Sequence, residues 1–205
     1  MTNINSLEQV ERKVFASYFN DGMWDIYGGL ILLGFGLAVL TGQMILLIVC
    51  IALAMVPVLV RKPVVTARLG NVQFSSHRQV KTARYKVLAW VAGLLFLVLG
   101  IVLMAWYSAG GTPTWFDNWM KDYFFIAIGA MLATLVWLAA YATSVARFYL
   151  HGLVVMATFI AASLLKPENL EGIPLVSGGG LVLLIGIFLL VRFLKNNPVH
   201  GGKED

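Results

Sequence analysis

Two aspartates stand four residues apart at the start of the first apolar run of this chain. In the segment DGMWDIYGG, Asp21 and Asp25 would share one face of a helix. Arg147 and His151 have the same spacing at the start of a later apolar run. If both runs enter a membrane from the same side, these four side chains lie at one depth, where ionisable groups are candidates for function. The sequence therefore nominates a polar cluster of Asp21, Asp25, Arg147 and His151. The structural alternatives are charge compensation of a helix N-terminus by the aspartates and anchoring of membrane orientation by Arg147.

No arrangement of residues matches a complete catalytic or metal-binding motif. Asp21, Gly22 and Asp25 match only the beginning of the aspartate-rich motif of CDP-alcohol phosphotransferases, and the downstream aspartates that would hold its metal ions are missing. The chain has no H-E-x-x-H or G-x-S-x-G sequence, and its three histidines lie in different segments. Cys50 is the single cysteine, so an intrachain disulfide is excluded. We therefore predict no catalytic residue, no metal site and no cofactor.

The composition is typical of a helical membrane protein. Hydrophobic residues make up 60% of the chain, charged residues make up 12%, and the mean hydropathy is +0.83. Apolar runs of about 17 to 20 residues recur, and each is long enough to cross a hydrocarbon core of about 30 Å. These runs do not alternate between apolar and polar residues, as the strands of a membrane barrel would. We expect an all-α fold, namely a polytopic membrane protein with a six-transmembrane-helix bundle and amphipathic interfacial helices.

The predicted spans divide the chain into a two-span front part and a four-span back part. The six spans are expected near residues 24–40, 44–60, 87–106, 123–142, 148–165 and 175–194. The parts are an N-terminal amphipathic interfacial segment (1–23), a transmembrane hairpin (24–60), a basic cytoplasmic loop (61–86), a four-span part (87–194) with an outer interfacial helix (113–121), and a disordered cytoplasmic tail (195–205).

Basic residues are distributed very unevenly between the two sides of this arrangement. If the N-terminus is inside, 13 of the 15 basic residues face the cytoplasm, and only Lys121 and Lys166 lie outside. Because basic loops are retained on the cytoplasmic side, the count predicts an N-in, C-in protein of the plasma (inner) membrane. The pI near 9.4 follows from these loops, so we expect no nucleic-acid partner.

The basic loop contributes seven of these residues and contains two local signals. Gly70 and Asn71 stand between short β-prone runs and predict a β-hairpin. Ser76 and Gln79 predict the capped start of a helix on which His77, Lys81 and Arg84 share one face. Cations are disfavoured at a helix N-terminus, so this face needs an anionic partner, and lipid headgroups are the nearest candidate.

Glycines recur at a spacing of seven residues in three of the predicted spans. The pairs are Gly29 and Gly36, Gly93 and Gly100, and Gly179 and Gly186. Seven residues are close to two helical turns, so each pair predicts one smooth face on which another helix can pack closely.

Two segments carry a resemblance. The segment DGMWDIYGGLILLGFGL, followed after the second span by TARLGNVQF, is similar to a pattern in small prokaryotic multi-pass membrane proteins of uncharacterised function. The resemblance implies a bacterial or archaeal origin and no particular activity, substrate or site.

These features favour a non-enzymatic membrane protein that works by binding or assembly. The expected partner is anionic lipid, another membrane protein or a second copy of the chain. The sequence leaves open a small transporter or channel for an uncharged or amphipathic solute, although the spans lack the buried carboxylates of ion-coupled carriers. An intramembrane enzyme is the third alternative.

Overall fold

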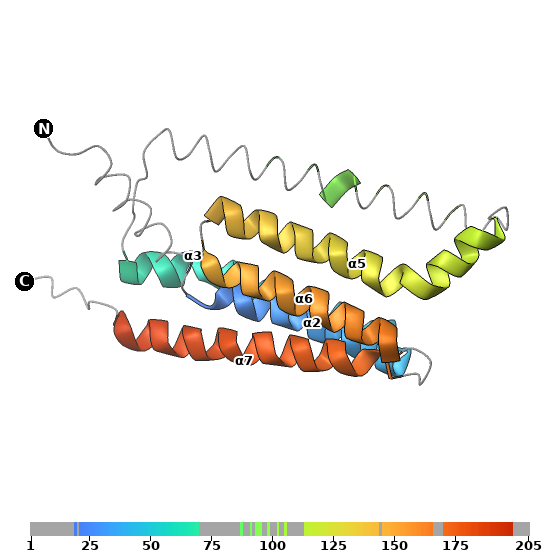
Figure 1. The fold of residues 1–205 in the computed structure, drawn as a ribbon. Coiled ribbons are helices and arrows are strands. Elements are labelled where there is room, and N and C mark those ends of the chain that lie inside the picture. The colour runs from blue at the N-terminus through green and yellow to red at the C-terminus, as the bar shows by residue number, and fades with distance from the viewer. Residues whose placement is uncertain are drawn as a thin grey trace, which may run out of the picture. The chain divides into compact units, whose positions relative to one another are not determined.

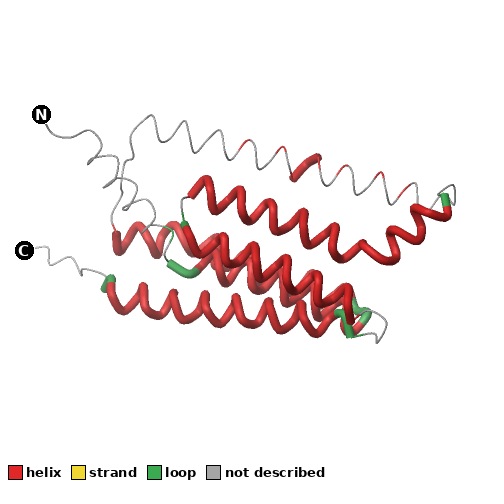
Figure 2. The backbone as a smooth tube through the Cα atoms, viewed as in Figure 1, coloured by secondary structure: helices red, strands yellow, loops and turns green. Residues whose placement is uncertain are grey.

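Helices account for almost all of the chain that the structure describes. The computed structural model describes residues 19, 21–69, 113–143, 145–165 and 170–198, with separate residues at 87, 91, 93–95, 98, 102 and 105. The five helices with defined bounds are α2 (Met23–Thr41), α3 (Met44–Leu69), α5 (Thr114–Thr143), α6 (Ala146–Leu165) and α7 (Gly172–Asn196), shown in Figure 1. These described residues contain no β-strand (Figure 2), and the prediction of an all-helical chain is confirmed.

Five of the described helical segments are long and apolar enough to cross a membrane. They are Met23–Thr41, Met44–Arg68, Asp122–Thr143, Ala146–Leu165 and Gly172–Asn196. The prediction of an all-helical protein with several candidate membrane-spanning helices is confirmed at this level. The further span expected near residues 87–106 lies largely outside the described residues, and the separate residues described there are helical.

The helices belong to two compact units. The first unit contains α2, α3 and α7 from Leu175 onward, and the second contains α5 and α6. In the first unit, α2 and α3 form a hairpin around Gly42, which closes α2 with a left-handed φ of 70°. The hydroxyl of Thr41 donates to the carbonyl oxygen of Leu37 at 2.7 Å and accepts the backbone N–H of Gln43 at 3.3 Å. These bonds satisfy polar groups at the end of α2, so two residues suffice to reverse the chain.

A row of glycines brings α2 into direct contact with α7. This glycine seam consists of Gly22, Gly29, Gly36, Gly179 and Gly186. A Cβ on Gly29 would lie 2.5 Å from the backbone nitrogen of Leu183, and one on Gly36 would lie 2.5 Å from that of Val176. Rising residue numbers on α2 therefore meet falling numbers on α7, so the two helices are antiparallel. Small residues permit this backbone contact, which is a favoured way to pack helices where no water drives association.

Helix α3 continues well past the predicted end of the second span. It runs to Leu69, so the β-hairpin prediction was wrong for the run before Gly70, which forms the last turns of a helix. Val65 is fully buried there, and Arg68 donates to the carbonyl oxygen of Val64 at 3.2 Å. Burial and the favourable position of a cation in the last helical turn outweigh the strand preference of the β-branched residues. Helix α3 is about 39 Å long, which exceeds the thickness of a hydrocarbon core of about 30 Å.

Helix α7 also extends past its predicted end. Lys195 and Asn196, which were assigned to a disordered tail, are helical. The backbone and side-chain amides of Asn197 both donate to the carbonyl oxygen of Phe193 at 3.0 Å. Phe193 is buried, so the last turn has both a hydrogen-bonded end and an apolar contact.

In the second unit, large aromatic side chains lie over glycines of the facing helix. The side chain of Phe159 in α6 covers Gly129 in α5, and the indole ring of Trp137 in α5 covers Gly152 in α6. The Trp137 indole N–H also donates to the carbonyl oxygen of Tyr149 at 3.1 Å. Helix α5 begins directly after Pro113, so the predicted outer interfacial helix and the following span form one continuous helix.

The predicted N-terminal helix, Gly100 and the chain after Pro198 lie outside the described residues.

Candidate functional site

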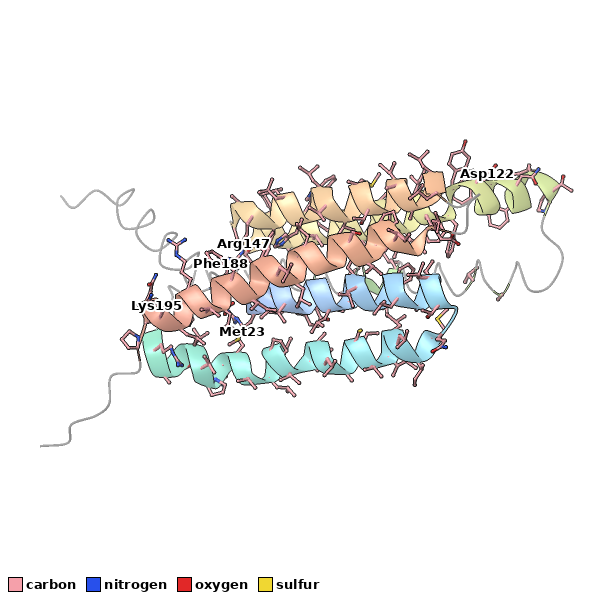
Figure 3. The ribbon with its side chains drawn as sticks, turned by 90° about the horizontal axis from the view of Figure 1, so that it is seen from below. Met23, Asp122, Arg147, Phe188 and Lys195 are labelled. Atoms are coloured by element: carbon pink, nitrogen blue, oxygen red, sulfur yellow. The ribbon has the colours of Figure 1, made fainter. Side chains whose placement is uncertain are left out.

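The first unit gathers all of its described charged residues at one end. The α2–α3 hairpin places the end of α3 beside the start of α2, and the antiparallel seam places the end of α7 there as well. Figure 3 labels Met23 and Lys195 at this end. The charged end consists of Asp21, Asp25, Arg61, Lys62, Arg68, Arg192 and Lys195. The opposite turn of the hairpin, Thr41-Gly42-Gln43, is uncharged.

A buried ion pair joins α3 to the start of α2. The Nε of Arg61 lies 2.6 Å from Oδ2 of Asp21, and the two side chains are 16% and 0% exposed. The other carboxylate oxygen of Asp21 accepts the backbone N–H of Met23 at 3.0 Å. The guanidinium also lies over the rings of Phe19 (4.9 Å) and Trp24 (5.8 Å). Because the carboxylate accepts both a charged donor and a helix N–H, its burial is compensated.

Asp25 lies one turn after Asp21 and is 1% exposed, so both carboxylates of the charged end are buried. Their position at the start of α2 is electrostatically favourable, because the N-terminus of a helix carries partial positive charge. Between them, Gly22 adopts a left-handed φ of 76°, and a Cβ there would lie 2.8 Å from the backbone nitrogen of Leu190. Helix α7 thus passes directly beside the aspartates.

Three of the five basic residues of the charged end are exposed, whereas Arg61 and Arg68 are partly buried. Lys62, Arg192 and Lys195 are exposed, and they are called the cationic rim below. Gly22 of α2 meets Leu190 of α7, and Asp21 beside it is bonded to Arg61 of α3. Arg192 and Lys62, which follow Leu190 and Arg61 closely in sequence, therefore lie at a similar level along the unit. Helices α3 and α7 both end here, and the partial negative charge of a helix C-terminus favours cations. The carboxylates of this end are therefore buried, and its exposed charged side chains are all cationic.

The second unit contains the other two residues of the predicted cluster. Arg147 and His151 lie in the first two turns of α6 and are partly buried. Both face Phe148, with the guanidinium 5.4 Å from its ring centroid and the two ring centroids of His151 and Phe148 5.9 Å apart. The structure thus brings Arg147 and His151 together in one unit, and Asp21 and Asp25 in the other.

Arg61 is the functional candidate that the sequence interpretation missed. It was counted only as a determinant of membrane orientation, although Asp21 and Arg61 stand at the two ends of one transmembrane hairpin. Both residues lie at the open end of this hairpin and therefore at a similar depth. That shared depth was the signal that could have paired Asp21 with Arg61. Gly22 was missed in the same way, since it continues the seven-residue spacing of Gly29 and Gly36 backwards by one step.

The structure describes the surroundings of only some of the remaining residues that were predicted to be functional. A Cβ on Gly93 would meet none of the described residues within 4 Å, in contrast to the glycine seam. The face of His77, Lys81 and Arg84 lies outside the described residues. Across the described part of the chain, no three His, Cys, Asp or Glu side chains are grouped to hold a metal ion.

The arrangement at the charged end can bind and orient an anionic group, because its exposed donors are all cationic. The buried carboxylates are turned inward toward the helices, and Asp21 already has a cationic partner.

Comparisons with protein-family models, with curated protein sequences and with solved structures find no match to this chain.

Proposed function

We propose that the protein is a non-enzymatic multi-pass membrane protein that binds anionic lipid headgroups at its cationic rim. The observation that carries this proposal is that every exposed charged side chain described at the charged end is cationic. Both aspartates of the charged end are buried, and Lys62, Arg192 and Lys195 are exposed. An outward-facing surface with charge of one sign attracts the opposite charge. At a membrane surface, the most concentrated opposite charge is that of anionic headgroups in the cytoplasmic leaflet.

The antiparallel packing of α2 against α7 supports an even number of membrane crossings. These are the first and last of the candidate spans in the described residues, and antiparallel spans return the chain to the side from which it started. Six spans meet this requirement when the apolar run predicted near residues 87–106 supplies the sixth. In this topology both termini and the cationic rim are cytoplasmic. Basic residues at the ends of spans favour this orientation in the inner membrane of a prokaryotic cell.

Native mass spectrometry from mild detergent tests the proposal. The wild-type protein, offered equal amounts of phosphatidylglycerol and phosphatidylcholine, should retain the anionic lipid preferentially. The triple variant Lys62→Gln, Arg192→Gln, Lys195→Gln should lose this preference by tenfold or more. Each cation near a membrane surface contributes about 1 kcal/mol, and about 1.4 kcal/mol corresponds to a tenfold change in binding.

The double variant Lys121→Gln, Lys166→Gln is the matched control, because it removes the two basic residues assigned to the opposite side. It should retain the wild-type lipid preference. A triple variant that still prefers phosphatidylglycerol would contradict the proposal. Loss of a bound second copy, with lipid retention unchanged, would instead identify the rim as an assembly surface.

A further inference from the structure

The first two turns of α5 extend past the end of the hairpin that α5 forms with α6. The hydroxyl of Ser163 donates to the backbone carbonyl oxygen of Asp122 at 3.2 Å, which aligns the last turn of α6 with the start of the candidate span at Asp122. The eight residues 114–121 precede that level and add about 12 Å of helix. Figure 1 shows that the beginning of α5 bends away from the axis of the rest of the helix, and Figure 3 labels Asp122 near this junction.

Two rows of exposed side chains run next to each other along this segment. The polar row consists of Thr114, Asn118 and Asp122, and the aromatic row consists of Trp115, Trp119 and Tyr123. The three aromatic side chains are 66%, 42% and 50% exposed, respectively. Members of each row are four residues apart, and the rows are one residue out of step, so they follow adjacent stripes of one helix. The outer surface of this segment therefore changes from polar to aromatic across its width.

Stacking holds the aromatic row in place. Phe116 is only 6% exposed, and its ring is stacked on Trp119 at a centroid distance of 6.3 Å. The ring of Trp119 in turn lies 6.3 Å from that of Tyr123. Trp115 meets the edge of Phe116 at 5.8 Å. A row ordered in this way loses little side-chain freedom when it binds a surface.

We propose that the aromatic row is a membrane-interface anchor. Its rings lie at the boundary between headgroups and acyl chains, and the polar row beside it faces water. Tryptophan and tyrosine favour this boundary because each joins a large apolar ring to a polar N–H or O–H group. The segment is continuous with a candidate span and directly precedes its first residue, Asp122, so the headgroup region is the environment next to it. The anchor is independent of lipid binding at the cationic rim, because it uses neutral aromatic side chains of the other unit.

Spin labels on single cysteines test the anchor in reconstituted bilayers. Cys50 is the only native cysteine, so Cys50→Ala gives a cysteine-free background. Labels are then placed by Trp119→Cys in the aromatic row, by Asn118→Cys in the polar row, and by Thr134→Cys within the candidate span. Collision with oxygen reports exposure to hydrocarbon, and collision with a water-soluble nickel chelate reports exposure to water. Thr134→Cys supplies the hydrocarbon reference, because Thr134 is exposed in the middle of α5.

We expect the Asn118 label to collide with the nickel chelate several-fold more often than the Trp119 label. The Trp119 label should have an oxygen-to-nickel ratio between those of the Asn118 and Thr134 labels. Equal and high nickel collision at both rows would place the segment in water and overturn the proposal. Low collision of both reagents at both rows would mean that protein covers the segment, which would overturn it as well. Trp115→Cys repeats the measurement one turn earlier in the same row, in case the Trp119 variant disturbs the stack.

Discussion

Gly29 of α2 meets the backbone of Leu183, whereas Gly152 of α6 meets the indole ring of Trp137. Gly29 thus allows two helix backbones to meet, whereas Gly152 provides a recess for a large ring. A backbone cannot move without shifting its whole helix, but an aromatic ring can rotate about its side-chain bonds. Gly29 should therefore be far less replaceable than Gly152.

The two units also place their arginines differently. Arg61 lies against a fully buried carboxylate and ties two helices of its unit together, whereas Arg147 lies over the ring of its sequence neighbour Phe148. The close contact of Gly22 with Leu190 and the buried ion pair occur at the same end of the first unit.

The largest loss of stability should follow from breaking the buried ion pair. Asp21→Ala leaves the guanidinium of Arg61 largely buried without its carboxylate, which should lower the free energy of unfolding by about 3–5 kcal/mol. Unfolding of the purified protein in mixed detergent micelles measures this change. The control is Lys62→Gln at the next position of α3, which is exposed and should change stability by less than about 0.5 kcal/mol.

A double variant separates the ion pair from general disruption of the charged end. Asp21→Ala combined with Arg61→Ala should lose clearly less stability than the sum of the single variants, because the second change removes the charge that Asp21 compensates. If the losses simply add, the two side chains do not stabilise the unit as a pair.

The next largest effect should come from the glycine seam. Gly29→Ala places a methyl group 2.5 Å from the backbone nitrogen of Leu183, so α2 and α7 must separate. We expect unfolding to become easier by about 3 kcal/mol, at the upper end of the usual cost of overpacking. Gly28→Ala is the matched control one position earlier, where a Cβ meets none of the described residues within 4 Å. It should be neutral or stabilising by up to about 1 kcal/mol, because alanine favours the helix.

The smallest effect should come from the glycine that lies under a ring. Gly152→Ala in α6 forces the indole of Trp137 to move, which should cost about 1 kcal/mol, at the lower end of the overpacking range. Adding Trp137→Phe should recover part of this loss, because the smaller ring makes room for the methyl group. The contrast between the units fails if Gly152→Ala is as harmful as Gly29→Ala in the same unfolding assay.

Hydropathy predicted the helices more accurately than it predicted their ends. The start of α3 at Met44 agrees with the sequence interpretation, because a two-residue turn leaves little freedom in where the next apolar run begins. The end of α3 was predicted nine residues too early, because a run of basic residues was interpreted as the start of a loop. A helix leaving the membrane can continue through basic residues, since its C-terminal carbonyl groups favour them.

The candidate site was predictable only where spacing carries the information. Seven-residue spacing identified Gly29, Gly36, Gly179 and Gly186 as a related set, but it could not show that α2 meets α7. That contact joins residues about 150 positions apart, and no local pattern encodes such a distance. The pairing of Asp21 with Arg61 depends on the geometry of a hairpin, whereas sequence reasoning considered residues by their spacing along one helix.

Cysteine labelling from one side of the membrane tests most directly whether the charged end is cytoplasmic. Single cysteines are introduced into the Cys50→Ala background by Lys62→Cys, Lys195→Cys and Gln43→Cys. A membrane-impermeant maleimide is then added to intact spheroplasts and, separately, to lysed membranes. We expect Gln43→Cys to react in intact spheroplasts, and Lys62→Cys and Lys195→Cys to react only after lysis. Labelling of Lys62→Cys or Lys195→Cys in intact spheroplasts would contradict a cytoplasmic charged end and, with it, the binding of cytoplasmic anionic lipid.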